Sequence, residues 1–349
     1  MSVATPRAAH RARTVGLPGS ARRVPRRQIV VTAVLTGVTV LLALLALGLG
    51  DYPLSPVEVV RAALDPAAGF AHEVVVEWRL PRVLTAVVFG AALGVSGAVF
   101  QSLTRNPLGS PDIIGFVTGS YTGALVALTV LGTTALSTTL GALLGGLGTA
   151  VVVYLLAYRD GILGFRLIIV GIAVTAALHA VNTYLLLRAE TEVAMAAAIW
   201  GAGSISLVGW EEALPAFLAL ALLTPLGLLA PSLRQLELGD DAARAHGLRV
   251  EPARLLLVLG GVALTAVVTA TAGPIAFVAL AAPQIARRLT ASAGLPLLPA
   301  AATGALLMLG ADVVAQHALP GGGVPVGIVT VVGGGVYLLA LLMIEVRRR

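Results

Sequence analysis

Residues 79–120 read RLPRVLTAVVFGAALGVSGAVFQSLTRNPLGSPDIIGFVTGS, and the run Val83–Leu103 within them decides the fold. This run contains no charged side chain. An α-helix needs about 20 mostly apolar residues to cross the hydrocarbon core of a bilayer. Gly90 and Gly94 put small residues on one face of that helix, where another helix can approach closely. We therefore interpret Val83–Leu103 as a membrane-spanning helix packed inside a bundle.

The composition extends this interpretation to the whole chain. Of its 349 residues, 58% are hydrophobic and 11% are charged, and the mean hydropathy is +0.95. Soluble globular proteins carry about 25% charged residues, so lipid must be the main solvent of this chain. We expect an all-α, polytopic membrane domain of about ten transmembrane helices over residues 28–349. The ten candidate spans are Gln28–Gly50, Val83–Leu103, Ile113–Leu131, Ala135–Ala157, Leu167–Leu187, Ala213–Ala230, Leu255–Thr271, Ile275–Arg288, Leu297–Ala315 and Val326–Val346.

Arginine placement sets the orientation. All 23 basic residues are Arg. With the N-terminus inside and the sides alternating, nineteen Arg residues fall on the inner side and four on the outer side, as the positive-inside rule requires. Omitting the short eighth span would place Arg347–Arg349 outside, so ten spans and two cytoplasmic termini are expected. Residues 1–27 are predicted to be a disordered, Arg-rich cytoplasmic tail, and Asp51–Arg82 an outer loop.

The reactive side chains present in the chain limit the classes of function that it can have. The chain has no Cys and no Lys, which excludes thiolate metal sites and a P-loop of its own. Its His residues are scattered, and no catalytic or metal-binding cluster is found. Ion-coupled secondary transporters keep buried ionisable groups, which are scarce in the predicted spans. Such a transporter and an integral membrane enzyme remain the alternatives to a permease that receives its energy from a partner. Nucleic acid is not an expected partner, because the positive charge fits membrane orientation.

The longest inner loop, residues 231–254, contains LELGDDAARAHGLRVEPAR from Leu236 to Arg254. Gly239 and Gly247 bracket a stretch long enough for about two helical turns, with acids at its N-terminal end, where the helix dipole favours them. One interpretation is a solvated surface helix. The other is a rigid element that docks on a cytoplasmic partner.

Four segments together resemble the FecCD family, the permeases of siderophore, haem and vitamin B12 ABC importers. The first is residues 79–120 quoted above, with its RLPR entry and its NPL-containing loop. The others are LGDDAARAHGL (Leu238–Leu248), AGPIAFVALAAPQIARRL (Ala272–Leu289) and the terminal LPGGGVPVGIVTVVGGGVYLLALL (Leu319–Leu342). The likeness covers nearly the whole chain from the first helix onward. One departure is Gln284, where the family pattern has His.

The resemblance implies a bacterial cytoplasmic-membrane permease that pairs with a second copy or a paralogue. Two cytoplasmic ATPase subunits would bind below, and an extracytoplasmic binding protein would dock above. ATP would be hydrolysed on the partner, so no catalytic residue, resident cofactor or metal ligand is expected, and iron would travel inside its chelator. Arg79 and Arg82 are expected to dock the binding protein through carboxylates.

The same resemblance assigns further residues. The residues expected to couple the permease to the ATPase are Gly239, Asp240, Ala243, Arg244 and Gly247. Gly164 and Phe165 fall in the inner gate region, within the loop Arg159–Arg166. Asn182 and Thr183 are expected to line the path. The identity of the chelate is left open by the sequence.

Overall fold

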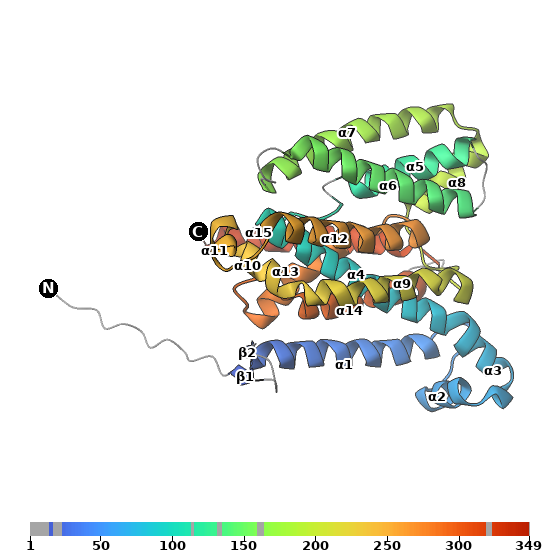
Figure 1. Ribbon diagram of the computed structural model, residues 1–349. Helices are drawn as coiled ribbons and strands as arrows, with labels where there is room; N and C mark the ends of the chain where they lie inside the picture. The colour runs from blue at the N-terminus through green and yellow to red at the C-terminus, as the bar shows by residue number, and fades with distance from the viewer. Residues whose placement is uncertain are drawn as a thin grey trace.

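The computed structural model describes residues 14–16, 23–112, 115–130, 135–158, 164–318 and 323–348. Long helices run side by side through the molecule, with α5 to α8 in one layer, α1 along the opposite edge, and α4 and α12 to α14 between them (Figure 1). The helices and strands are β1 Thr14–Gly16, β2 Arg23–Pro25, α1 Arg26–Gly48, α2 Pro56–Leu64, η1 Pro66–Ala68, α3 Phe70–His72, η2 Glu73–Arg79, α4 Leu80–Thr104, α5 Phe116–Val130, α6 Ala135–Ala157, α7 Gly164–Arg188, α8 Thr191–Gly201, α9 Trp210–Leu228, α10 Ala230–Glu237, α11 Asp240–Ala245, α12 Val250–Ala272, α13 Val278–Thr290, α14 Leu297–His317 and α15 Val326–Arg348.

Each of the ten predicted spans coincides with a helix, in the same order. They correspond to α1, α4, α5, α6, α7, α9, α12, α13, α14 and α15. Seven of the helices in the described part of the chain are long and apolar enough to cross a membrane, and α5 and the first part of α15 are shorter apolar helices. The fold is almost entirely helical, as the composition predicts.

The predicted outer loop, Asp51–Arg82, is largely helical. Ser55 caps α2 in a reciprocal capping box with Glu58, in which each side chain hydrogen-bonds the backbone N–H of the other residue. From Phe70 the chain is helical again, and it passes through a π-helical turn, η2, directly into α4. The helix that contains α4 therefore begins about three turns before the apolar run that predicts it.

Helix α4 is the centre of the bundle. It packs against α9, α12, α13 and α14, and most of its side chains are buried. Its glycines allow this burial: a Cβ at Gly90 would collide with the carbonyl of Gly304 on α14, and one at Gly97 with the carbonyl of Ala279 on α13. Backbone meets backbone at these crossings, which is how helices gain dispersion energy in lipid.

A second glycine seam joins α5 to α6. A Cβ at Gly119 would collide with Thr149, and one at Gly123 would collide with the carbonyl of Gly141. The close approach predicted at Gly90 and Gly94 is thus found in α4, and the glycines of α5 and α6 serve the same tight packing within the subunit. Helix α7 lies against this α5–α6 pair.

The start of α1 and the end of α15 lie on the same side of the bundle (Figure 1). At the start of α1, the Arg27 Nε donates to the carbonyl of Leu289 at 2.8 Å, and the Gln28 amide donates to Ser292 at 2.7 Å, both just at the end of α13. The far end of α15 lies on this side of the bundle as well (Figure 1). Of the predicted 1–27 tail, the strands β1 and β2 pair antiparallel, and residues 1–13 and 17–22 lie outside the described part.

Candidate transport and docking sites

Arg82, a predicted docking residue, is engaged inside the subunit at the outer end of α4. Its Nη2 donates to Asp312 Oδ1 at 2.8 Å and its Nε to Asp312 Oδ2 at 3.1 Å. The two side chains are 14% and 2% exposed. Ser206 and Gln316 complete the cluster through bonds to Arg82 and Asp312. This bidentate pair connects α4 to α14 and to the loop before α9.

Arg79, the second predicted docking residue, lies three residues before Arg82. It donates to the carbonyls of Leu47 at 2.8 Å and Tyr52 at 2.9 Å, and so holds the turn that follows α1. Its side chain is partly exposed, at the outer rim of the bundle. Both predicted docking residues thus lie at the expected end of α4, and each also makes hydrogen bonds within the subunit.

The predicted coupling segment forms the short helix α11, at the opposite end of α4 from Arg82. Its residues face different ways. Ala243 is fully buried against the end of the bundle, and Asp240 is turned towards the chain, where it accepts hydrogen bonds from Arg105 and Arg254. Arg244 is exposed and pairs with Asp241 at 3.3 Å and Glu251 at 3.8 Å. A partner that docks on this helix therefore meets Arg244, while Ala243 and Asp240 hold the helix in place.

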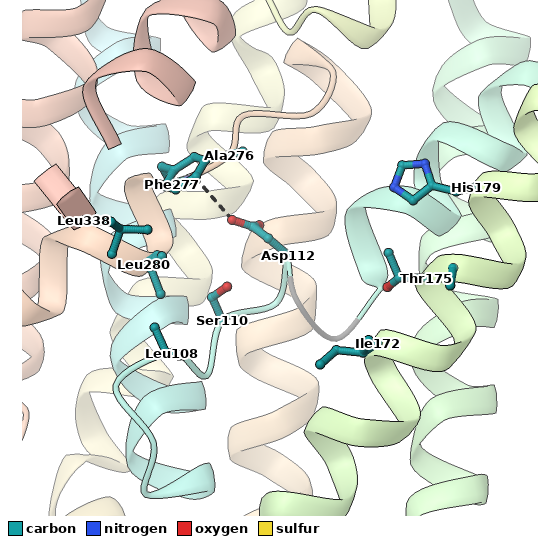
Figure 2. Close-up of a pocket in the computed structure, with 11 residues that line it drawn as sticks. Leu108, Ser110, Asp112, Ile172, Thr175, His179, Ala276, Phe277, Leu280 and Leu338 are labelled. Carbon is teal, nitrogen blue, oxygen red and sulfur yellow. Dashed lines mark hydrogen bonds between the residues drawn. The ribbon is translucent and has the colours of Figure 1, made fainter. Parts of the chain in front are cut away.

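A cavity of about 550 Å³ opens between α7, the loop after α4 and the turn before α13. Most of its lining is apolar, but Ser110, Asp112, Thr175 and His179 also face it (Figure 2). Asp112 Oδ2 accepts a long hydrogen bond of 3.4 Å from the Phe277 backbone N–H. Asp112 Oδ1 and the hydroxyls of Ser110 and Thr175 are buried and have no hydrogen-bond partner in the described part of the chain. Such groups are uncommon in folded proteins, and here they gather at one cavity.

The predicted gate and path residues lie on α7. Asn182 is buried, 3% exposed, whereas Thr183 beside it is exposed. Asn182 therefore faces the interior of the subunit and Thr183 faces outward, and the role of both residues in the path stays a prediction. Gly164 and Phe165 form the first turn of α7, and their side chains lie outside what the structure describes, as do residues 159–163 of the predicted gate loop.

Sequence reasoning missed the acidic and basic partners that complete these sites. Asp112 follows a proline in a loop and reads as an ordinary turn residue. Asp312 is separated from Arg82 by 230 positions. The pairing of Asp240 with Arg254 spans a change of direction between two helices. No periodicity or motif spacing brings such residues together, so only the packing of the bundle identifies them.

A bundle of apolar helices, a short polar helix at one end and a cavity between helices fit a multi-pass membrane permease. Residues 38–344 match the model of the FecCD transport family. The chain is 47% identical to the ferric enterobactin transport permease FepG of Escherichia coli, over 93% of this chain and 99% of that protein. It is 35% identical to the Fe(3+) dicitrate transport permease FecD of the same organism, over 86% of this chain and 94% of that protein.

A solved structure of an ABC transporter is also similar to this chain. An inward-facing metal-chelate type ABC transporter is 30% identical, with a TM-score of 0.79 over 90% of this chain and 99% of that one. The chain belongs to the FecCD transport family. It is a transport protein rather than an enzyme, the permease subunit of an ABC importer in the cytoplasmic membrane.

Proposed function

We propose that this permease imports a ferric chelate of the siderophore class and draws its energy from a separate ATPase subunit. The support for the cargo is the family match together with relatives named for ferric enterobactin and Fe(3+) dicitrate. The iron ion is cargo and keeps its chelator as its ligand during passage. The permease then needs a path wide enough for a bulky complex rather than a set of metal ligands.

The single observation that best supports a separate ATPase as the energy source is the way in which α11 is held at the end of the bundle. An exposed Arg244 on a helix whose other side is buried presents a fixed surface to a cytoplasmic partner. ATP binds to and is hydrolysed on that partner, and this chain contributes no nucleotide-binding residue. Closure of the ATPase pair moves α11, and the helices transmit the movement to the path.

The cavity at Asp112 is proposed as a segment of the path. Its volume of about 550 Å³ suits a drug-sized organic ligand. It is bounded on one side by α7, where the outward-facing Thr183 lies. A second copy of the chain or a paralogue, packed against α7, completes the path and contributes its own residues to the wall. The unpartnered oxygens then meet cargo or water.

Arg79 and Arg82 are proposed to position the binding protein at the outer mouth. Their guanidinium groups already hold the outer ends of α1 and α14 in register. A carboxylate of the binding protein that approaches this rim meets two ordered cations rather than two flexible ones, which lowers the entropic cost of docking. Arg79→Glu is expected to weaken docking while assembly with the ATPase persists.

The test is uptake into proteoliposomes that contain the permease, its ATPase and a loaded binding protein. Uptake of a radiolabelled ferric chelate is expected to require ATP and to persist when the proton gradient is collapsed. Arg244→Glu is expected to leave ATP hydrolysis running while uptake is lost. Uptake that continues without nucleotide but stops with the gradient would refute the proposal and would favour an ion-coupled transporter, with Asp112 as its carboxylate.

A further inference from the structure

The helix α11 is too short to be held by its own hydrogen bonds. It has six residues, and it is flanked by Gly239 and Gly247, whose φ angles are +115° and +81°. Short isolated helices are unstable in water, so contacts with the rest of the chain must fix this one. The two glycines allow sharp turns on both sides, and a Cβ at either would meet nothing within 4 Å. Position and orientation of α11 therefore depend on its side-chain contacts.

Asp240 makes the strongest of these contacts. The Arg254 Nη2 donates to both of its carboxylate oxygens at 2.7 Å, and the Arg254 side chain is 7% exposed. The Arg105 Nη2 reaches Asp240 Oδ1 at 3.4 Å and also donates to the carbonyl of Leu236 at 3.1 Å. Arg254 belongs to α12, and Arg105 is the residue that ends α4. One carboxylate thus joins α11 to two spanning helices.

The link continues from Arg105 to the cavity through a hydrogen-bonded turn. Arg105 has a left-handed conformation, φ +49°, and its N–H bonds back to the last turn of α4. Asn106 Oδ1 accepts from the Leu108 N–H at 2.9 Å, and the Asn106 carbonyl accepts from the Gly109 N–H at 2.9 Å. This tight turn carries Leu108 directly into the wall of the cavity (Figure 2).

We propose that Asp240 is a positioning residue that transmits movement of α11, through Arg105, to the loop that forms the cavity wall. The inference rests on the proposed ATPase-driven function and specifies how force reaches the path. Asp240 acts through Arg105 and Arg254, which bind its carboxylate. Asp241, the next residue, provides the contrast: its side chain is fully exposed and pairs only with Arg244 of the same helix in the described part of the chain.

The chain has no cysteine, so a single introduced cysteine is the only thiol of this chain that maleimide can label. Leu108, which is 51% exposed, is replaced by Cys in the complete complex with ATPase and binding protein. The rate of maleimide labelling is measured without nucleotide and with the ATPase trapped in its ATP-bound state. We expect several-fold different rates in the two states. Asp240→Asn should bring the ratio to one, whereas the matched control Asp241→Asn should keep the ratio of the parent complex.

A second variant distinguishes loss of the Asp240–Arg105 link from misfolding. Arg105→Gln removes a largely exposed partner and leaves the buried Arg254–Asp240 pair intact, so the fold should persist, and the labelling ratio should again approach one. Restoration of the ratio by Asp240→Glu would add support. The inference is overturned if the parent complex responds to nucleotide and either Asp240→Asn or Arg105→Gln responds equally, or if Asp241→Asn loses the response to the same extent. A parent complex whose labelling at Leu108→Cys does not respond to nucleotide also overturns the inference, whereas the ATPase-driven function is judged separately by the ATP dependence of uptake.

Discussion

The substitution Arg82→Ala should destabilise the permease, because it leaves the buried carboxylate of Asp312 without its counter-charge. Asp312 is 2% exposed, and both of its oxygens accept from Arg82. Removing one partner of a buried ion pair costs about 3–5 kcal/mol, because the remaining charge has lost both water and its counter-charge. Gln316, which donates to Asp312 at 2.7 Å, is not altered by the truncation and can continue to stabilise the carboxylate. We therefore expect the lower end of that range, about 3 kcal/mol.

The assay is reversible unfolding of the purified permease in lipid–detergent mixtures, followed by the loss of helical circular dichroism. Arg61→Ala is the matched control, because Arg61 lies exposed on α2 and makes no ion pair within the described residues. It should change the free energy of unfolding by less than about 0.5 kcal/mol. The double variant Arg82→Met with Asp312→Leu removes both charges and should recover most of the stability.

The same variants separate stability from docking. The double variant folds without the Arg82 cation, so its affinity for the binding protein measures the docking role alone. If the folded double variant binds the binding protein more weakly, Arg82 is a docking contact. If binding is unchanged, the role of Arg82 is structural only. The reasoning about the pair is refuted if Arg82→Ala is as stable as Arg61→Ala, since an internal pair with these exposures cannot be lost without cost.

Three further predictions concern packing, the cavity and the outer cap. Gly97→Val drives side-chain atoms into a carbonyl of α13 and should sharply reduce the yield of monodisperse protein in size-exclusion chromatography, whereas Gly148→Ala, which meets nothing within 4 Å, should not. Asp112→Asn should alter the KM or the maximal rate of chelate uptake in proteoliposomes at unchanged thermal stability, because the carboxylate has no partner on Oδ1 in the described part of the chain. The hydrogen bonds from Ser55 lower the pKa of Glu58, so their stabilising effect is present above the ordinary Glu pKa and is lost as the pH falls through the lowered one. Ser55→Ala should move the Glu58 pKa upwards in a carboxylate NMR titration.

The membrane domain was predictable because its main signal is local. Each span is an uninterrupted apolar run of about membrane thickness, and the positive-inside rule then fixed the number of spans. The spacing of Gly90 and Gly94 indicated a packing face, although the identity of α14 as the partner did not follow from it. Local signals failed at the boundaries, where Phe70–Arg79, predicted as part of the outer loop because of its charged residues, extends the α4 helix.

The site was predictable only in part, for a related reason. Family resemblance places Asp240 and Ala243 in a coupling segment but does not say which way each side chain faces. Ala243 is buried because α11 lies against α10 and α12, and Asp240 faces Arg254 because α12 begins beside it. These orientations result from the packing of three helix ends, which no single segment encodes.

The two ion-pair clusters lie at opposite ends of the same helix, and this arrangement has a mechanical consequence. Arg82 near the start of α4 is bound to Asp312, and Arg105 at its end is bound to Asp240. Between them the helix is held by its buried side chains and, at the glycines, by direct contact with neighbouring backbones, where no side-chain rotamer can absorb a displacement. Movement imposed on α11 must therefore displace α4 as a rigid rod or break one of its terminal clusters. Because the outer cluster is the more buried of the two, we expect the outer end of α4 to act as the pivot, while the inner end, with Arg105 and the loop that follows it, moves with α11.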